Sequence, residues 1–204
     1  YIGMELMRCS YDDLIFDRGQ RVTYDFNLRV GRQIAAAMAF LHSKRILHRD
    51  LKPSNVLMDD NFVAKLTDFG LARRLHSQHR RDVPVSKPHG TPSYMAPERL
   101  LEERGADDEA VDVYSFGVTM IEAFTREPIF SNTPPTLIVV KLASGELRAR
   151  VPPSLRIPPA LRRLLEECVA TDPAERPTFT DVLDTLHQPT MFQRSGTRGS
   201  GTRQ

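Results

Sequence analysis

One stretch decides the interpretation of this 204-residue chain, His48-Arg49-Asp50-Leu51-Lys52-Pro53-Ser54-Asn55, and a second motif, Asp68-Phe69-Gly70, follows it. Together they place two carboxylates, an amide and an ammonium group on turns beside short apolar segments. These groups suit phosphoryl transfer, because that reaction is catalysed mainly by positioning and charge neutralisation. One carboxylate can orient an attacking hydroxyl and accept its proton. The other carboxylate and the amide oxygen can hold Mg²⁺, which prefers oxygen ligands.

The two motifs resemble the catalytic loop and the metal-binding loop of the eukaryotic protein kinases. By that resemblance Asp50 is the catalytic base and Lys52 contacts the transferred phosphate, whereas Asn55 and Asp68 hold the metal ions. The implied cofactors are ATP and Mg²⁺. Taken singly, each aspartate would be interpreted as a turn or capping residue. Their place in two complete motifs favours the catalytic interpretation.

Other residues of the resemblance are expected to support the site. His48 is expected to pack against Phe69 as a buried side chain. Arg49 would pair with a phosphate on the activation loop, and a structural ion pair that holds the loop is an equal alternative. Asp112 is expected to be buried and hydrogen-bonded to the backbone of the catalytic loop.

Further motifs follow in the order that the kinase resemblance implies. The loop that positions peptide substrates is matched by Gly90-Thr91-Pro92-Ser93-Tyr94-Met95-Ala96-Pro97-Glu98. The start of the central buried helix is matched by Asp112-Val113-Tyr114-Ser115-Phe116-Gly117. Arg176, in Glu175-Arg176-Pro177, is expected to pair with Glu98. The resemblance covers roughly residues 1–190, and ordered motifs over such a length argue against coincidence.

The first residues resemble the hinge of a kinase, whose backbone meets the adenine of ATP. The implied nucleotide contacts are Met4, which guards the back pocket, Glu5, Met7 and Leu57. The glycine-rich phosphate cover and the strand lysine of the family precede the hinge and have no match in this sequence. We therefore expect a large lobe with the N-terminal lobe missing, which binds Mg·ATP weakly and requires that lobe as a partner.

A segment without regular period, residues 71–96, is rich in arginine, histidine, proline and serine and is interpreted as a long loop. Phosphorylation by an upstream activating kinase would order this loop through new arginine–phosphate pairs. The candidate positions are Ser77, Ser86, Thr91 and Ser93. The alternative is a solvated, flexible loop.

The implied substrates are proteins phosphorylated on serine or threonine, because Lys52-Pro53-Ser54-Asn55 and Thr91 resemble the Ser/Thr-directed branch of the family. The segments Tyr114-Ser115-Phe116-Gly117-Val118 and Arg176-Pro177-Thr178-Phe179 are similar to the tyrosine-kinase-like group. Two alternatives remain open, a non-catalytic kinase-like binding or scaffold module and a small-molecule phosphotransferase. The intact catalytic residues weigh against the first, and the peptide-positioning loop weighs against the second.

Hydrophobic periodicity predicts an α+β fold that is mainly helical and has short strands. Apolar residues recur at helical spacing over 26–41, 113–124, 161–169 and 182–186, and a further helix is expected after Pro134-Pro135, with Gly145 at its end. Short strands are expected at 46–47, 56–58 and 63–66, and a short buried strand that runs into a connector is expected over 1–8.

Composition limits the remaining possibilities. Apolar residues make up 40% of the chain and charged residues 26%, as in ordinary globular domains. The formal net charge of +2 argues against nucleic acid as a partner, and no apolar run is long enough to span a membrane. Two cysteines cannot form a disulfide framework, so an intracellular, cytoplasmic protein is expected, with a membrane tether before Tyr1 left open. A kinase domain is expected over 1–190 and a disordered Gly/Ser/Thr/Arg-rich tail over 191–204.

Overall fold

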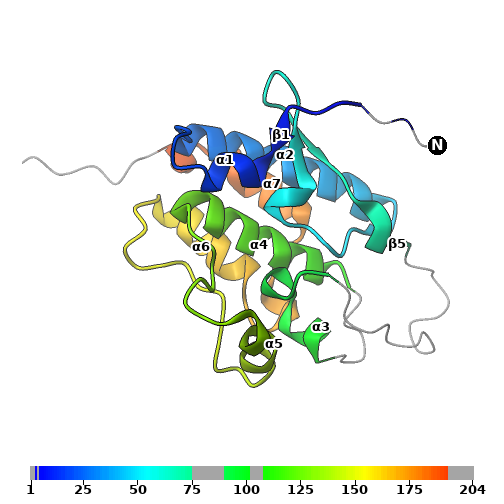
Figure 1. Ribbon diagram of the computed structural model, residues 1–204, viewed down its shortest axis with the longest axis vertical. Coiled ribbons are helices and arrows are strands. Elements are labelled where there is room, and N and C mark those ends of the chain that lie inside the picture. The colour runs from blue at the N-terminus through cyan, green and yellow to red at the C-terminus, as the bar shows by residue number, and fades with distance from the viewer. Residues whose placement is uncertain (1–2, 4, 75–89, 102–107, 193–204) are drawn as a thin grey trace, which may run out of the picture.

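A long buried helix, α4 (Ala110–Thr125), runs through the middle of the computed structural model (Figure 1). Every side chain from Val111 to Ala123 is buried, because the sequence there is apolar on nearly every face. The structure describes residues 3, 5–74, 90–101 and 108–192. The other elements are arranged around this helix.

Three helices pack around α4 and form the body of the domain. α2 (Tyr24–Ser43) lies against α4 and α7 (Phe179–Leu186), and α6 (Pro159–Cys168) also contacts both. The Thr23 hydroxyl accepts a hydrogen bond from Phe26 N–H at 3.1 Å and fixes the start of α2. Among the described residues, no helix combines the length and the apolar character that a membrane span needs.

Short strands lie at one end of this helical body (Figure 1). β1 (Cys9–Ser10), β3 (Val56–Met58) and β4 (Ala64–Leu66) form an antiparallel sheet in the order β1-β3-β4. β2 (Ile46–Leu47) pairs antiparallel with β5 (Arg73–Arg74). A short helix, α1 (Tyr11–Phe16), continues directly from β1 and packs on a 3₁₀ turn at Pro53–Asn55.

Two further helices, α3 (Pro97–Leu100) and α5 (Pro135–Ala143), lie together at the other end (Figure 1). Each has proline in its first turn, where the missing N–H leaves no hydrogen bond unmade. A 3₁₀ turn at Pro92–Tyr94 packs on both α4 and α5 and joins this end to the central helix. The remaining 3₁₀ turns are at Phe69–Leu71, Pro173–Glu175 and Pro189–Phe192.

The expected fold class, α+β with a mainly helical body, is confirmed. The sequence predicts a short buried strand that runs into a connector over 1–8, and the described residues of that segment contain no strand. Glu5, Leu6 and Met7 are not in a strand, and Leu6 is 95% exposed, because no described residue covers it. Periodicity does not predict α1 or α3, since such short helices show no apolar stripe.

The end of the described chain is packed on the body. Met191, the first residue of the expected tail, is buried, and its carbonyl O accepts a hydrogen bond from Tyr24 OH at 2.7 Å. The remainder of that tail, 193–204, lies outside the described residues.

The close approach of α6 to α4 requires glycine at position 117. A Cβ there would lie 2.7 Å from Val169 Cγ1 and 2.8 Å from Cys168 Cβ. We expect Gly117→Ala to lower the free energy of unfolding by about 1–3 kcal/mol, because overpacking outweighs the gain in helix propensity. Urea denaturation measures this loss.

Gly31→Ala on α2 is the matched control. A Cβ at position 31 would lie 2.8 Å from Met120 Cε, the end of a flexible side chain that can move aside. Its cost should stay below about 1 kcal/mol. An equal loss in the free energy of unfolding in Gly117→Ala and Gly31→Ala would contradict a rigid contact at Gly117.

Candidate active site

The Asp50 carboxylate lies at the centre of a set of hydrogen-bond donors. Its Oδ2 accepts a hydrogen bond from Asn55 Nδ2 at 3.0 Å, and Lys52 Nζ lies 3.0 Å from the same oxygen. Its Oδ1 faces the backbone N–H of Thr91 at 3.3 Å. Asn55 Nδ2 also donates to the Asp50 carbonyl O at 2.8 Å. The structure therefore brings Asp50, Lys52 and Asn55 into direct contact, with Asp50 only 9% exposed.

Arg49, the residue before Asp50, has a strained backbone conformation that hydrogen bonds fix at both its N–H and its carbonyl group. Arg49 has φ 68°, in the left-handed region that residues with a Cβ disfavour. Its N–H donates to Asp112 Oδ1 at 2.8 Å, and its carbonyl O accepts a hydrogen bond from Arg99 Nη1 at 2.6 Å. Such strain persists only where the surroundings fix it, and it is typical of functional sites.

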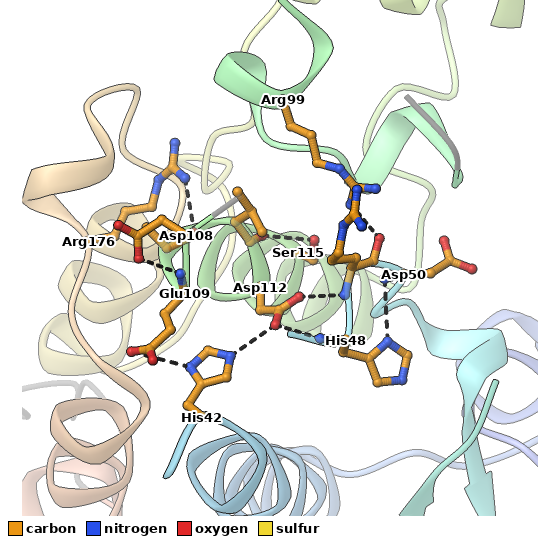
Figure 2. A network of polar contacts seen from close by, with 12 residues as sticks. His42, His48, Asp50, Arg99, Asp108, Glu109, Asp112, Ser115 and Arg176 are labelled. Carbon is orange, nitrogen blue, oxygen red and sulfur yellow. Dashed lines mark hydrogen bonds and ion pairs between the residues drawn. The ribbon is translucent and has the colours of Figure 1, made fainter. Parts of the chain in front are cut away.

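Asp112, at the start of α4, contacts the catalytic loop and the end of α2. Its Oδ2 accepts a hydrogen bond from His48 N–H at 2.9 Å and lies 2.9 Å from His42 Nε2 (Figure 2). The Asp112 side chain is fully buried, so these contacts take the place of hydrogen bonds to water. The His42 ring packs edge-on against Phe179 at 5.1 Å between ring centroids. Sequence reasoning missed His42, because nothing in the periodicity of α2 distinguishes it.

The metal-binding motif is joined to the catalytic loop through its backbone. His48 Nε2 lies 3.0 Å from Thr67 O, and Thr67 N–H donates to Asn55 O at 3.0 Å. Asp68 follows in the left-handed conformation, with φ 61°. The His48 and Phe69 ring centroids lie 5.1 Å apart. Asp68 thus extends from a backbone that is fixed to the catalytic loop, and its carboxylate is exposed.

The peptide-positioning loop closes over the Asp50 carboxylate. The Thr91 hydroxyl accepts a hydrogen bond from Lys52 Nζ at 2.7 Å, so Lys52 bridges Asp50 and Thr91. Gly90 has φ 132°, and a Cβ there would lie 3.2 Å from Asp50 Oδ1. Both conformation and space therefore favour glycine. Ser93 is half-buried in the 3₁₀ turn that follows.

Glu122 is a buried carboxyl group that the sequence analysis did not single out. The Tyr94 hydroxyl donates to Glu122 Oε2 at 2.6 Å, and Ile129 N–H donates to Oε1 at 2.9 Å. Burial raises the pKa of Glu122, and the two hydrogen bonds oppose that shift. Burial also raises the pKa of Tyr94 far above its usual value, so the phenol remains a donor. A glutamate inside the apolar run of α4 is the sequence signal that could have indicated this contact.

A buried ion pair between Glu98 and Arg176 anchors the end of the same loop. Arg176 Nη1 and Nη2 donate to Glu98 Oε1 and Oε2 at 2.6 and 2.9 Å. Arg176 Nη1 also donates to Ala110 O at 3.0 Å, and the guanidinium lies over the Tyr114 ring at 5.1 Å. A planar guanidinium can make all these contacts, whereas a lysine ammonium cannot.

The hinge-like segment is exposed along most of its described length. Glu5 forms an ion pair with Lys65 on β4, with 2.7 Å between Oε2 and Nζ. Met7 and Leu57 are half-buried. Three residues singled out from the sequence lie outside the described part of the chain: Met4, Ser77 and Ser86.

Asn55 and Asp68 have the ligand atoms that Mg²⁺ requires. Asn55 donates through Nδ2 to Asp50, which leaves its amide oxygen as the available ligand. The Asp68 carboxylate is exposed, and its Oδ1 accepts a hydrogen bond from Gly70 N–H at 3.3 Å. One carboxylate and one amide oxygen beside substrate phosphates suit this cation, so the residues fit Mg²⁺.

Comparison with known proteins identifies the family. A family model described as the protein kinase domain matches residues 1–187. A probable LIM domain-containing serine/threonine-protein kinase of Dictyostelium discoideum is 36% identical over 177 residues, which are 87% of this chain and 26% of that protein. Receptor-interacting serine/threonine-protein kinase 4 of Homo sapiens is 36% identical over 163 residues, 76% of this chain and 20% of that protein. The chain belongs to the protein kinase family.

A serine/threonine-protein kinase of Arabidopsis thaliana is 37% identical over 161 residues, 79% of this chain and 27% of that protein. The kinase resemblance is thereby confirmed, and these relatives are Ser/Thr kinases by name. The chain spans about a quarter or less of the length of these three relatives.

We expect Asp112→Asn to loosen the catalytic loop. The amide has one acceptor oxygen where the carboxylate has two, and its NH₂ group would face a donor. A buried N–H left unsatisfied costs about 1–3 kcal/mol. The free energy of unfolding should fall by that amount, and the amides of His48 and Arg49 should exchange with deuterium faster.

The control for this variant is Asp181→Asn, which changes an exposed capping carboxylate at the start of α7. It should cost about 0.5–2 kcal/mol and leave exchange at residues 48–50 as in the parent. Unchanged exchange at those residues in Asp112→Asn would show that the carboxylate does not hold the loop.

The raised pKa of Glu122 predicts a pH-dependent stability. The folded protein binds more protons at this group than the unfolded chain, so stability falls as pH rises from the ordinary value of 4.5 through the raised pKa. Glu122→Gln should remove this dependence. The free energy of unfolding of the variant, measured in urea, should therefore rise relative to the parent across that window and then level off.

Glu127→Gln, at an exposed position just after α4, serves as the control for that series. The difference in the free energy of unfolding between this variant and the parent should not grow with pH in the same window. If the difference in the free energy of unfolding between Glu122→Gln and the parent also stayed constant with pH, burial would not disfavour the charged form of Glu122.

Proposed function

We propose that the protein containing this chain transfers the γ-phosphate of ATP to serine or threonine hydroxyls of protein substrates. The observation that carries the proposal is the position of Asp50, whose carboxylate is fixed by Asn55, Lys52 and the Thr91 N–H. A carboxylate oriented in this way suits a general base. Membership of the protein kinase family, with Ser/Thr kinases among the relatives, supports the same reaction.

The two oxygens of Asp50 have different surroundings. Oδ2 is in contact with Asn55 and Lys52, whereas Oδ1 has a longer contact with Thr91 N–H. Oδ1 is therefore the oxygen proposed to accept the proton of the incoming hydroxyl. Lys52 Nζ, which lies between Asp50 and Thr91, is placed to stabilise negative charge on the transferred phosphoryl group.

Mg²⁺ bound with ATP would neutralise charge on the phosphate oxygens. Asn55, through its amide oxygen, and Asp68, through its exposed carboxylate, are the proposed ligands. The hydrogen bond from Thr67 N–H to Asn55 O supports this pairing, because it fixes the two segments to each other.

Nucleotide binding is proposed to require a further, N-terminal lobe that covers the site, and such a lobe is the proposed partner. Leu6 is 95% exposed and Phe69 is 48% exposed, so apolar side chains of the hinge-like segment and the metal-binding motif face solvent. The proposed adenine contacts are Met4, Glu5, Met7 and Leu57.

Phosphorylation of the activation loop by an upstream kinase is proposed to act through Arg49. Arg73 on β5 pairs with Leu47 on β2, and Arg49 follows Leu47 by two residues, so the two arginines come from adjacent segments. Phosphate groups pair well with such arginines. The proposed sites of modification are Ser77, Ser86 and Ser93.

Thr91 is assigned a different role from those serines. Its hydroxyl accepts a hydrogen bond from Lys52, and its N–H faces Asp50. A phosphate at this position would bring like charge towards the Asp50 carboxylate. Thr91 is therefore proposed as a fixed part of the site, which positions Lys52.

Protein substrates, in preference to small molecules, are supported by the anchoring of the Gly90–Glu98 loop. Tyr94 binds Glu122 on α4, and Glu98 binds Arg176 before α7. A loop fixed at both places can present a stable backbone surface beside Asp50, as recognition of an extended peptide requires.

Asp50→Asn tests the proposed function. Phosphate transfer from ATP to Ser/Thr peptides by the whole protein should fall at least about 10²-fold, because the general base is lost. Asp60→Asn, which changes an exposed carboxylate just after β3, is the matched control and should transfer at the parent rate. The urea midpoint of Asp60→Asn should match the parent, whereas that of Asp50→Asn should fall, because its buried NH₂ group would face a donor. Circular dichroism should show both variants folded under the assay conditions.

Transfer that persists in Asp50→Asn would exclude this residue as the base. A parent protein that binds partners but transfers no phosphate would favour the non-catalytic module. The same assay on this chain alone should show little activity, and tight Mg·ATP binding with turnover would contradict the need for a covering lobe.

A further inference from the structure

Arg126 joins the end of α4 to α1 through hydrogen bonds to four backbone carbonyl groups. Its Nε donates to Ile15 O at 3.0 Å, and its Nη1 donates to Gln20 O at 2.9 Å. Its Nη2 donates to Leu14 O at 3.4 Å and also to Asp17 O. These carbonyls lie in the last turn of α1 and in the turn after it, where helix C=O groups have no partners of their own. A cation there also complements the negative end of the helix.

The backbone of Arg126 is unfavourable for arginine. As the residue that ends α4 it has φ 57°. This left-handed conformation at a helix C-terminus favours glycine, which has no Cβ to clash. Arginine occupies a position that suits glycine, and the hydrogen bonds of its side chain to α1 offset the strain.

A second set of contacts binds the other end of α1 to the same turn of α4. The Tyr11 hydroxyl donates to Asn27 Oδ1 at 2.8 Å, and Asn27 Nδ2 donates to Ala123 O at 2.7 Å. α1 has only six residues, too few for a stable isolated helix. Its position therefore depends on these contacts and on the burial of its apolar side chains.

α1 lies against the end of the catalytic loop, where it packs on the turn Pro53–Asn55. On its other side α1 follows β1 without a loop, because Ser10 is both the last strand residue and the helix cap. A displacement of α1 therefore reaches the hinge-like segment directly.

We propose that Arg126 is a positioning residue for the active site, whose side chain fixes α1, and through it β1 and the hinge-like segment, to the end of α4. Because it assigns α1 a place beside bound nucleotide, this role rests on the proposed function. Asp112 at the start of α4 holds the catalytic loop, and Arg126 just after its end holds the nucleotide side. The rigid helix α4 thus sets the spacing between the catalytic loop and the segment proposed to bind nucleotide.

Hydrogen exchange on this chain, without nucleotide, tests the assignment. In Arg126→Ala the amides of residues 11–20 and 8–10 should exchange at least about tenfold faster, because the local opening loses several charge-assisted hydrogen bonds. Exchange in α6 and α7 should remain as in the parent. Arg126→Lys should fall between the parent and Arg126→Ala, because an ammonium retains the charge but cannot reach four carbonyl groups.

Two further variants separate this role from general destabilisation. Arg126→Gly loses the guanidinium but relieves the strained φ, so α1 should exchange as fast as in Arg126→Ala while the urea midpoint is higher. Arg162→Ala is the matched control, since Arg162 on α6 also donates to backbone carbonyls, those of Val151, Pro152 and Leu155. It should leave α1 unchanged.

The assignment fails if α1 exchanges normally in both Arg126→Ala and Arg126→Gly, or if Arg162→Ala affects α1 equally. It also fails if α1 loosens while residues 8–10 exchange as in the parent. In the whole protein, Arg126→Gly should raise KM for ATP at least about threefold with a smaller change in kcat. A parent that transfers no phosphate would disprove the proposed function, and the exchange results would still decide the role of Arg126.

Discussion

A single buried carboxylate, that of Asp112, is the contact on which the geometry of the catalytic loop depends. It accepts hydrogen bonds from the backbone of His48 and Arg49, and it meets His42 from α2. Arg49 is left-handed, which costs roughly 1–2 kcal/mol for a residue with a Cβ. Without Asp112 on the N–H and Arg99 on the carbonyl O, that residue would relax. The carboxylate of Asp50, the next residue, would then no longer be held in its orientation.

The same helix that carries Asp112 fixes the other parts of the site. Along α4, Ser115 Oγ donates to Tyr94 O at 2.8 Å, and Glu122 accepts a hydrogen bond from the Tyr94 hydroxyl. Just after its end Arg126 holds α1. A helix buried on all sides cannot move easily, because its neighbours are close-packed. The groups around Asp50 are therefore positioned before any ligand arrives, and such preorganisation is what electrostatic catalysis requires.

The sequence was sufficient for those parts of the structure that depend on local pattern. The long helices follow from apolar periodicity, and the contact of Asp50 with Lys52 and Asn55 follows from residues close together in the chain. The pattern failed at 1–8, where apolar residues predict a strand but Leu6 is exposed. Glu122 and Arg126 were missed for a different reason. Their partners are fixed only by folding, and Arg126 meets Ile15 across a separation of 111 residues.

The two carboxylates that first indicated the function are in very different environments, and the difference has a physical consequence. Asp50 is buried and in contact with three donors, so its direction is set entirely by this chain. Asp68 is exposed beside a half-exposed Phe69, and its hydrogen bond comes from the neighbouring Gly70 N–H. An exposed carboxylate in water attracts a cation only weakly, because the high dielectric constant screens its charge. On the proposed function, the surroundings of the base Asp50 come from this chain itself, whereas the binding of Mg·ATP at Asp68 is proposed to strengthen when a covering lobe excludes water.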